Sequence, residues 1–212
     1  MSNQSDHTTV RERGYLPHWE RTDATYFVTF RLADALPRDV LDRLDAERQL
    51  LEARFAARKL AGDTTAPASP QTAIARQIEQ YLDTGMGACY LATPAFASLV
   101  ADALRYFDEK RYRLFTWCIM PNHVHVIVQP FAGYPLAKLI HSWKSYTAHA
   151  AARLRGSSGP FWQREYYDYL VRDETRFIRL VRYVLRNPVK ARLGDWPWVY
   201  VREGLLMEAE QG

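Results

Sequence analysis

The strongest constraint on the fold is a pair of apolar, β-branched runs separated by only two residues. Residues 111–120 (RYRLFTWCIM) and 123–129 (HVHVIVQ) are rich in the side chains that are typical of buried strands. Pro121 and Asn122 stand between the runs, and this pair of residues suits a tight connection. The two runs therefore predict neighbouring antiparallel strands.

The other predicted elements do not alternate strictly between strand and helix. Two further runs, 25–32 and 166–172, are predicted as strands. Apolar residues at helical intervals predict helices over 36–60, 71–83, 94–107, 135–154 and 173–187. Thr93 and Asp173 are expected to cap two of these helices, and Pro188 is expected to stop the last one. This order predicts an α+β fold, a ferredoxin-like antiparallel sheet of about four to five strands with packed helices.

The chain length of 212 residues favours a single domain. We expect an N-terminal arm over 1–24, the domain over 25–200 and a C-terminal tail over 201–212. A stretch rich in small residues and proline follows residue 60 and marks a helical insertion at about 62–92. The helix before it is expected to be long and amphipathic.

The composition is that of an ordinary globular protein, with 48% hydrophobic and 25% charged residues. We find no apolar run long enough to span a bilayer and no charged-then-apolar leader, so a soluble, cytoplasmic protein without a membrane partner is expected. Cys89 and Cys118 are isolated, which excludes a disulfide framework and a cysteine zinc cluster. Both are expected to be small buried hydrophobes.

Positive charge gathers in the last third of the chain, although the formal net charge is only +4. Between Arg153 and Arg192 there are ten Lys and Arg residues against four Asp and Glu residues. Tryptophan and tyrosine are interleaved with these cations, and this mixture suits a nucleic-acid surface because cations hold phosphates while rings stack on bases. A solvated basic helix face explains the charge equally well.

Two histidines stand one residue apart at the start of the second strand. Residues two apart in a strand point to the same face, so His123 and His125 are expected side by side while the intervening valines face the core. Two imidazoles on one rigid strand form half of a metal site, and an oxygen ligand would favour Mg²⁺ or Mn²⁺. The alternative is a pair of histidines that are hydrogen-bonded at the sheet surface. Zinc has weak support, because no nearby Cys or His completes a tetrahedral set.

The last predicted helix carries a tyrosine at the edge of its buried stripe. Tyr183 lies just beyond that stripe, Asn187 follows one turn later, and Arg176 and Arg179 precede it. A positioned phenol can attack phosphorus when a metal withdraws charge from the phosphate oxygens, and the Asn187 carbonyl is a hard oxygen ligand. The alternatives are a packing role for Tyr183 with a wet hydroxyl and a terminating role for Asn187.

Three stretches taken together resemble the REP-associated tyrosine transposases, a branch of the single-tyrosine HUH nucleases that act on single-stranded DNA. They are MPNHVHVIVQP, FWQREYYDYLVRDE and YVLRNPVKARL, in this order and spacing. The resemblance covers most of the chain from Arg13 to about Trp198. It implies that His123 and His125 bind the metal, that Tyr183 is the nucleophile and that Asn187 is the third metal ligand. The segment 62–92 is longer than the family pattern requires, and Tyr169 stands where related sequences often have a histidine.

The resemblance also implies a reaction and its partners. Tyr183 would cleave single-stranded or hairpin DNA at REP-type palindromes through a 5′-phosphotyrosine, in a monomer or homodimer associated with the nucleoid. We expect phosphate contacts from Lys144, Arg164, Arg176 and Arg179, and base stacking on Trp162 and Tyr166. Surface solvation or core packing is the alternative for each, and core packing is favoured for Trp162. Two rival functions are a regulatory or genome-maintenance protein that binds REP hairpins and a metal-dependent phosphohydrolase with a structural tyrosine.

Overall fold

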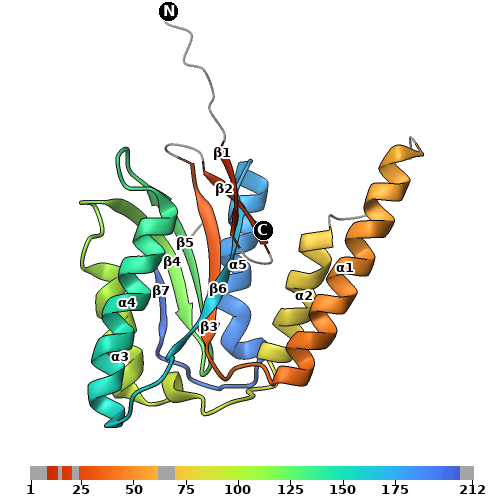
Figure 1. The fold of residues 1–212 in the computed structure, drawn as a ribbon. Coiled ribbons are helices and arrows are strands. Elements are labelled where there is room, and N and C mark those ends of the chain that lie inside the picture. The colour runs from red at the N-terminus through yellow and green to blue at the C-terminus, as the bar shows by residue number, and fades with distance from the viewer. Residues whose placement is uncertain (1–8, 14–15, 21–23, 62–69, 206–212) are drawn as a thin grey trace, which may run out of the picture.

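A five-stranded antiparallel sheet forms the centre of the computed structural model, which describes residues 9–13, 16–20, 24–61 and 70–205 (Figure 1). The strands are β3 (Tyr26–Leu32), β4 (Tyr112–Ile119), β5 (His123–Pro130), β6 (Trp162–Leu170) and β7 (Val199–Val201), arranged in the order β6-β3-β5-β4-β7. The predicted pair β4 and β5 is antiparallel, with Ile119 opposite Val124 next to the turn. The expected α+β, ferredoxin-like fold is confirmed.

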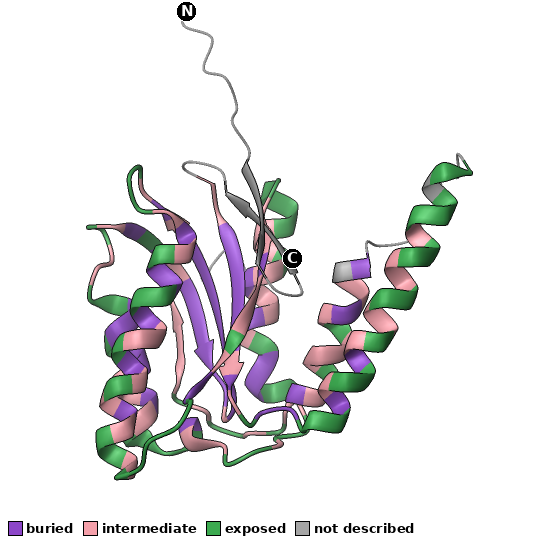
Figure 2. Cartoon of the chain, in the orientation of Figure 1, coloured by how far each residue is buried: buried purple, intermediate pink, exposed green. Residues whose placement is uncertain are grey.

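Helices cover both faces of this sheet. α3 (Pro94–Arg105) and α4 (Leu136–Arg155) pack on one face, and α5 (Glu174–Lys190) packs on the other (Figure 1). A short 3₁₀ helix, η1 (Tyr90–Ala92), leads into α3. Strands β3, β5 and β4 are buried almost throughout (Figure 2). The sheet is therefore a rigid platform whose α5 face can hold a site in fixed geometry.

The alternation of side chains along β5 divides the core into two parts. Val124, Val126 and Val128 belong to the larger cluster beneath α3 and α4. Ile127 belongs to the smaller cluster beneath α5, together with Val181 and Val184 of that helix. His123 and His125 lie on the α5 side, and the sequence predicts that they share one face of the strand, opposite the valines.

Two long helices form a hairpin that stands beside the sheet (Figure 1). They are α1 (Arg38–Leu60) and α2 (Pro70–Leu82). The expected apolar stripe of α1 is fully buried only near its start: Val40 and Leu44 are buried, whereas Leu51 and Phe55 farther along are half-buried. Figure 2 shows the far half of α1 mainly in the exposed and intermediate colours, because it extends beyond the sheet. The predicted start of the insertion, 62–69, lies outside the described residues.

Strand β6 begins four residues earlier than predicted and ends at Leu170 instead of residue 172. A register shift between Phe30 and Leu32 of β3 lets Leu32 pair with Trp162, which extends the ladder at its start. Helix α5 runs past Pro188, which was expected to stop it, and ends at Lys190. A proline in the last turn removes only one helical hydrogen bond, and the Ala191 amide still donates to the Asn187 carbonyl at 3.0 Å.

Three described strands have no counterpart in the prediction. They are β7 and the antiparallel pair β1 (Thr9–Arg13) and β2 (Leu16–Glu20). Cys118 is buried as expected, whereas Cys89 is only partly buried, so that expectation is wrong for Cys89. No helix in the described ranges is both long enough and apolar enough to cross a bilayer.

Candidate functional site

The site is built on β5, where the two histidines face the same way. Both side chains are fully buried, their ring centroids lie 4.7 Å apart, and their Nε2 atoms are separated by 3.0 Å. Two cis ligands that each lie about 2.1 Å from an octahedral ion are about 3.0 Å apart. The spacing of the imidazole nitrogens therefore fits chelation of one cation.

Neighbouring side chains hold each ring by its other nitrogen. The Asn122 amide donates to the carbonyls of Leu82 at 3.2 Å and Met86 at 3.0 Å, which fixes its oxygen toward His123 Nδ1 at 2.7 Å. His123 Nδ1 must then carry the hydrogen, and burial lowers the pKa of His123 to about 3. Its Nε2 consequently presents a lone pair to the site. His125 Nδ1 is held by the Thr29 hydroxyl at 2.8 Å.

Helix α2 brings a carboxylate to the histidines. Glu79 Oε1 lies 3.0 Å from His125 Nε2 and 3.9 Å from His123 Nε2, and the three residues can offer ligand atoms that all lie within 4.8 Å of one another. Glu79 Oε1 is buried and has no hydrogen-bond partner of good geometry in the described part of the chain. Burial acts to raise the pKa of Glu79, but His125, His123 and the Tyr183 hydroxyl together outweigh it and hold that pKa well below its usual range. A buried carboxylate beside imidazole lone pairs suits a divalent cation.

Helix α5 places a phenol next to this group. The rings of Tyr183 and His125 have centroids 5.4 Å apart, and Phe27 packs edge-on against Tyr183 at 5.8 Å. Burial raises the pKa of Tyr183 above its ordinary value, and the Glu79 carboxylate, which accepts the phenol hydrogen, raises it further. The phenol is therefore protonated at neutral pH and held by its neighbours.

Asn187 lies one helical turn beyond Tyr183 and is also buried. Its amide acts in the opposite sense to Glu79, lowering the pKa of the phenol. Among the described residues, neither Asn187 Oδ1 nor Nδ2 has a hydrogen-bond partner of good geometry. A buried amide without hydrogen bonds lowers the stability of the fold unless a ligand satisfies it. The Asn187 carbonyl oxygen is therefore suited to bind a ligand at the site.

The hairpin is tied to α5 next to the site. Lys190 at the end of α5 forms an ion pair with Asp83 at 2.5 Å, just after the end of α2. Glu79 and Tyr183 line one cavity of about 340 Å³, together with Phe27, Thr29 and Tyr167 from the sheet. The cavity therefore joins β3, β6, α2 and α5 around the phenol.

The structure brings together His123, His125, Tyr183 and Asn187, the four residues that the sequence singles out for chemistry. The stacking candidates lie elsewhere: Trp162 is buried in the core under α4, where its indole N–H donates to the Thr147 hydroxyl at 2.8 Å. This is the packing alternative given above. Tyr166 packs against the same core, on the sheet face opposite the histidines.

The cationic candidates are also dispersed. Lys144 donates to the backbone carbonyls of Gln163 at 2.7 Å and Arg164 at 2.8 Å, which links α4 to β6. Arg176 contacts Tyr169 and Asp173 at the start of α5, about 10 Å along the axis from Tyr183. Arg164 and Arg179 are exposed. Their contacts with phosphate stay a prediction.

Sequence reasoning did not single out Glu79. Its helix was predicted, but an isolated glutamate on a surface helix has no distinguishing spacing, and its closeness to the histidines depends on how the hairpin docks. Tyr167, which faces the site, was likewise not singled out. Tyr167 on β6 pairs with Thr29 on β3, the residue whose hydroxyl holds His125. The register of these two strands is therefore the signal that identifies Tyr167.

Fold and site together define a ferredoxin-like α+β protein with a two-histidine centre next to a helix-borne tyrosine. Residues 99–187 match the family model described as "Transposase IS200 like". The matched segment runs from α3 through both histidines and Tyr183 to Asn187. The resemblance to transposases that the motifs indicate is confirmed for this segment, which is less than half of the chain.

Other similarities are more distant. An uncharacterised protein from Haemophilus influenzae is 23% identical over 99 residues, which cover 36% of this chain and 54% of that protein, so the chain spans about half the length of this curated relative. A solved structure described as a REP-associated tyrosine transposase bound to a REP hairpin has a TM-score of 0.47 at 16% identity, covering 94% of this chain and 82% of the other. A provisionally assigned transposase from Deinococcus radiodurans R1 has a TM-score of 0.30 at 12% identity, covering 84% and 96%.

Proposed function

We propose that the protein is a metal-dependent single-stranded DNA endonuclease and strand transferase that acts at REP-type hairpins. The observation that carries this proposal is the placement of the Tyr183 phenol directly beside the His123, His125 and Glu79 group. A surface tyrosine with a packing role would not need two buried histidines and a buried carboxylate next to its hydroxyl. The match of residues 99–187 to IS200-like transposases supports the same class of reaction.

The residues present fit a divalent cation, and Mg²⁺ or Mn²⁺ suits the mixed nitrogen and oxygen donors. His123, His125 and Glu79 would hold it, and Asn187, whose side chain interacts with the Tyr183 phenol, would offer its carbonyl oxygen as a further donor. When bound, the ion would offset the charge of Glu79 and of a DNA phosphate. Glu79 therefore joins the ligand set that the resemblance implies.

Tyr183 supplies the nucleophile in this mechanism. Its oxygen forms a bond to phosphorus while the bond from phosphorus to the 3′ oxygen breaks, which leaves a 5′-phosphotyrosine and a free 3′-hydroxyl. The phenol loses its proton and the departing oxygen gains one, so charge and atoms balance. Packing against Phe27 and His125 orients the phenol, and the adjacent amide of Asn187 favours the developing phenolate.

Strand transfer is the reverse of this step with a different 3′-hydroxyl. Because the phosphotyrosine preserves the energy of the broken bond, rejoining needs no external energy source. With one nucleophilic tyrosine per active site, two DNA ends require sequential use of the site or two subunits, so monomer or homodimer stays a prediction. A cytoplasmic, nucleoid-associated location is part of the same proposal.

The test is covalent capture of DNA. The protein is incubated with a single-stranded palindromic oligonucleotide and Mg²⁺ or Mn²⁺, and a protein–DNA adduct that resists denaturation is expected. Tyr183→Phe should abolish the adduct, whereas Tyr167→Phe, a matched change in the same cavity, should retain it. An adduct with Tyr183→Phe would remove the proposed nucleophile. Cleavage without any adduct would support the phosphohydrolase, and tight binding without cleavage would support the regulatory protein.

A further inference from the structure

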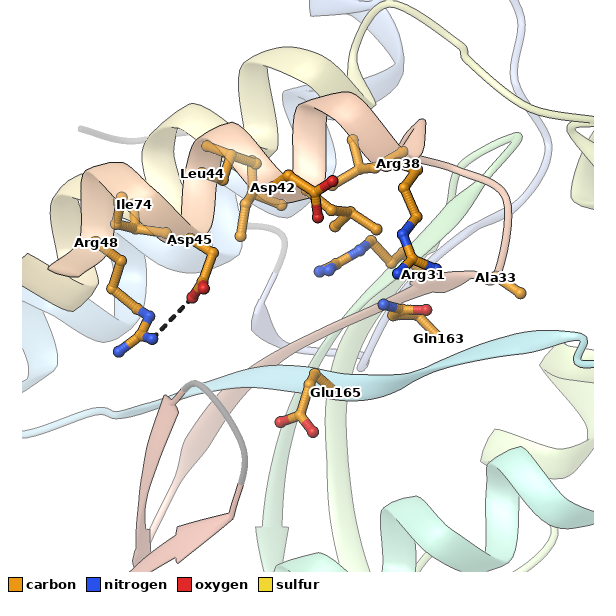
Figure 3. A pocket seen from close by; sticks show the side chains of 13 residues that line it. Arg31, Ala33, Arg38, Asp42, Leu44, Asp45, Arg48, Ile74, Gln163 and Glu165 are labelled. Atoms are coloured by element: carbon orange, nitrogen blue, oxygen red, sulfur yellow. Dashed lines mark hydrogen bonds and ion pairs between the residues drawn. The ribbon is translucent and has the colours of Figure 1, made fainter.

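A second cavity, of about 520 Å³, lies between the α1–α2 hairpin and the edge of the sheet (Figure 3). It shares two lining residues, Arg31 and Ile78, with the cavity that holds Tyr183. The two cavities are therefore adjacent, and Arg31 lies in the wall between them. A ligand in the cavity lined by Tyr183 and Glu79 could extend past Arg31 into the second cavity.

Arg31 is unusual among the cations of this region. It lies on β3 directly opposite His123 and is mostly buried. Burial lowers the pKa of Arg31 to about 10, and Glu165 acts to raise it, so the guanidinium is charged at neutral pH. Its side chain makes no hydrogen bond or ion pair with any residue that the structure describes. A largely desolvated cation of this kind favours an anionic partner, and a phosphate group suits the planar guanidinium.

The second cavity itself is not a phosphate channel. Three arginines are matched by three acidic residues in its lining, which is therefore neutral overall. Arg48 is already paired with Asp45 at 2.8 Å and Glu52 at 2.9 Å, and Figure 3 shows the first of these contacts. Beyond Arg31, the cavity consequently offers little net attraction for a run of phosphates.

The lining does suit a flat ring with a polar edge. Helices α1 and α2 contribute the aliphatic side chains of Leu41, Leu44, Ile74 and Ile78, and α1 also contributes four charged side chains. Strand β6 contributes the amide of Gln163 and the carboxylate of Glu165. Figure 3 shows both β6 side chains across the cavity from the two helices. Apolar walls can cover the faces of a nucleobase, and an amide with a carboxylate can bind the donors and acceptors on its edge. The apolar wall residues are Leu36, Leu41, Leu44, Ile74 and Ile78.

We propose that this second cavity, the base pocket, binds one unpaired nucleobase of a DNA strand whose neighbouring phosphate lies at the histidine pair. Arg31 contacts the phosphate between the two cavities. The proposal rests on the DNA-processing function proposed above and assigns a specificity role to the hairpin that carries Glu79. The hairpin then forms one wall of the nucleotide site.

The test measures DNA binding in the Tyr183→Phe protein, so it does not depend on cleavage. A series of single-stranded oligonucleotides, each with one abasic position, is titrated by fluorescence anisotropy. We expect one position next to the cleaved bond at which base removal weakens binding about tenfold, because burying one base against aliphatic side chains contributes an effect of this order. Leu41→Trp, which fills the pocket, should weaken binding of intact DNA about tenfold and abolish the abasic effect at that position.

Leu50→Trp is the matched control, because it makes the same change on an exposed position of the same helix and should behave like the parent. Gln163→Leu is a second pocket variant, and it removes only a contact to the edge of the base. It should reduce, but not abolish, the loss of affinity on base removal. A flat abasic scan, or an undiminished penalty in a folded Leu41→Trp protein, would overturn the base pocket. Neither result bears on adduct formation by the wild type. That measurement tests the proposed function separately.

Discussion

Replacing Asn122 by alanine tests whether the histidine pair is organised in advance for a metal. The Asn122 side chain is buried and makes three hydrogen bonds, to the carbonyls of Leu82 and Met86 and to His123 Nδ1. Each buried group that loses its partner costs about 1–3 kcal/mol. Partial access of water to the vacated space reduces the sum, so we expect a loss of about 3 kcal/mol in unfolding free energy.

The same substitution should weaken metal binding. Loss of a partner that orients a ligating histidine typically lowers metal affinity by about 10- to 100-fold. Asn122→Asp is the informative comparison, because its carboxylate keeps an oxygen facing His123 Nδ1 but loses both amide donors. We expect Asn122→Asp to be destabilised about as much as Asn122→Ala while its metal affinity is at least that of the wild type.

Mn²⁺ titration by calorimetry and denaturant unfolding measure the two effects on the same samples. The reasoning is refuted if folded Asn122→Ala binds Mn²⁺ within twofold of the wild type. It is also refuted if Asn122→Asp loses affinity as strongly as Asn122→Ala, since orientation of His123 would then not be the cause.

Three further predictions address other parts of the structure. Glu79→Gln should lower Mn²⁺ affinity by at least about tenfold in calorimetry, whereas Glu47→Gln, on the same hairpin, should not. Burial lowers the pKa of Lys144 to about 8 from 10.5. The folded protein loses this proton at a lower pH than the unfolded chain does. The free energy of unfolding should therefore rise between about pH 8 and pH 10.5 in the wild type and not in Lys144→Met. Trp162→Phe should lose about 2 kcal/mol in denaturant unfolding but leave DNA affinity unchanged; weakened binding by a folded variant would restore the stacking role.

The sheet and the histidine pair could be predicted because local patterns determine them. Alternation along 123–129 puts both histidines on one face whatever packs above them, and a helical spacing of four puts Asn187 one turn after Tyr183. These relations depend only on strand and helix geometry. They therefore appear in the sequence itself.

The contribution of the hairpin could not be predicted in the same way. Glu79 reaches His125 because α2 docks beside α5, where the Asp83 and Lys190 ion pair lies. Docking of this kind depends on contacts between segments about 100 residues apart, which no local period encodes. The predicted phosphate-binding cations do not lie together for a related reason. Lys144 was selected for its charge alone, whereas in the fold its ammonium group links α4 to β6.

Mass spectrometry of the trapped adduct is the most direct test of the central claim. After incubation with palindromic single-stranded DNA and Mn²⁺, the protein is digested with protease and nuclease, and the peptide that carries the remaining nucleotide is sequenced. The account predicts a 5′-phosphate linked to the oxygen of Tyr183 and a free 3′-hydroxyl on the released strand. A nucleotide attached to any other residue, or linked through its 3′ end, would contradict it.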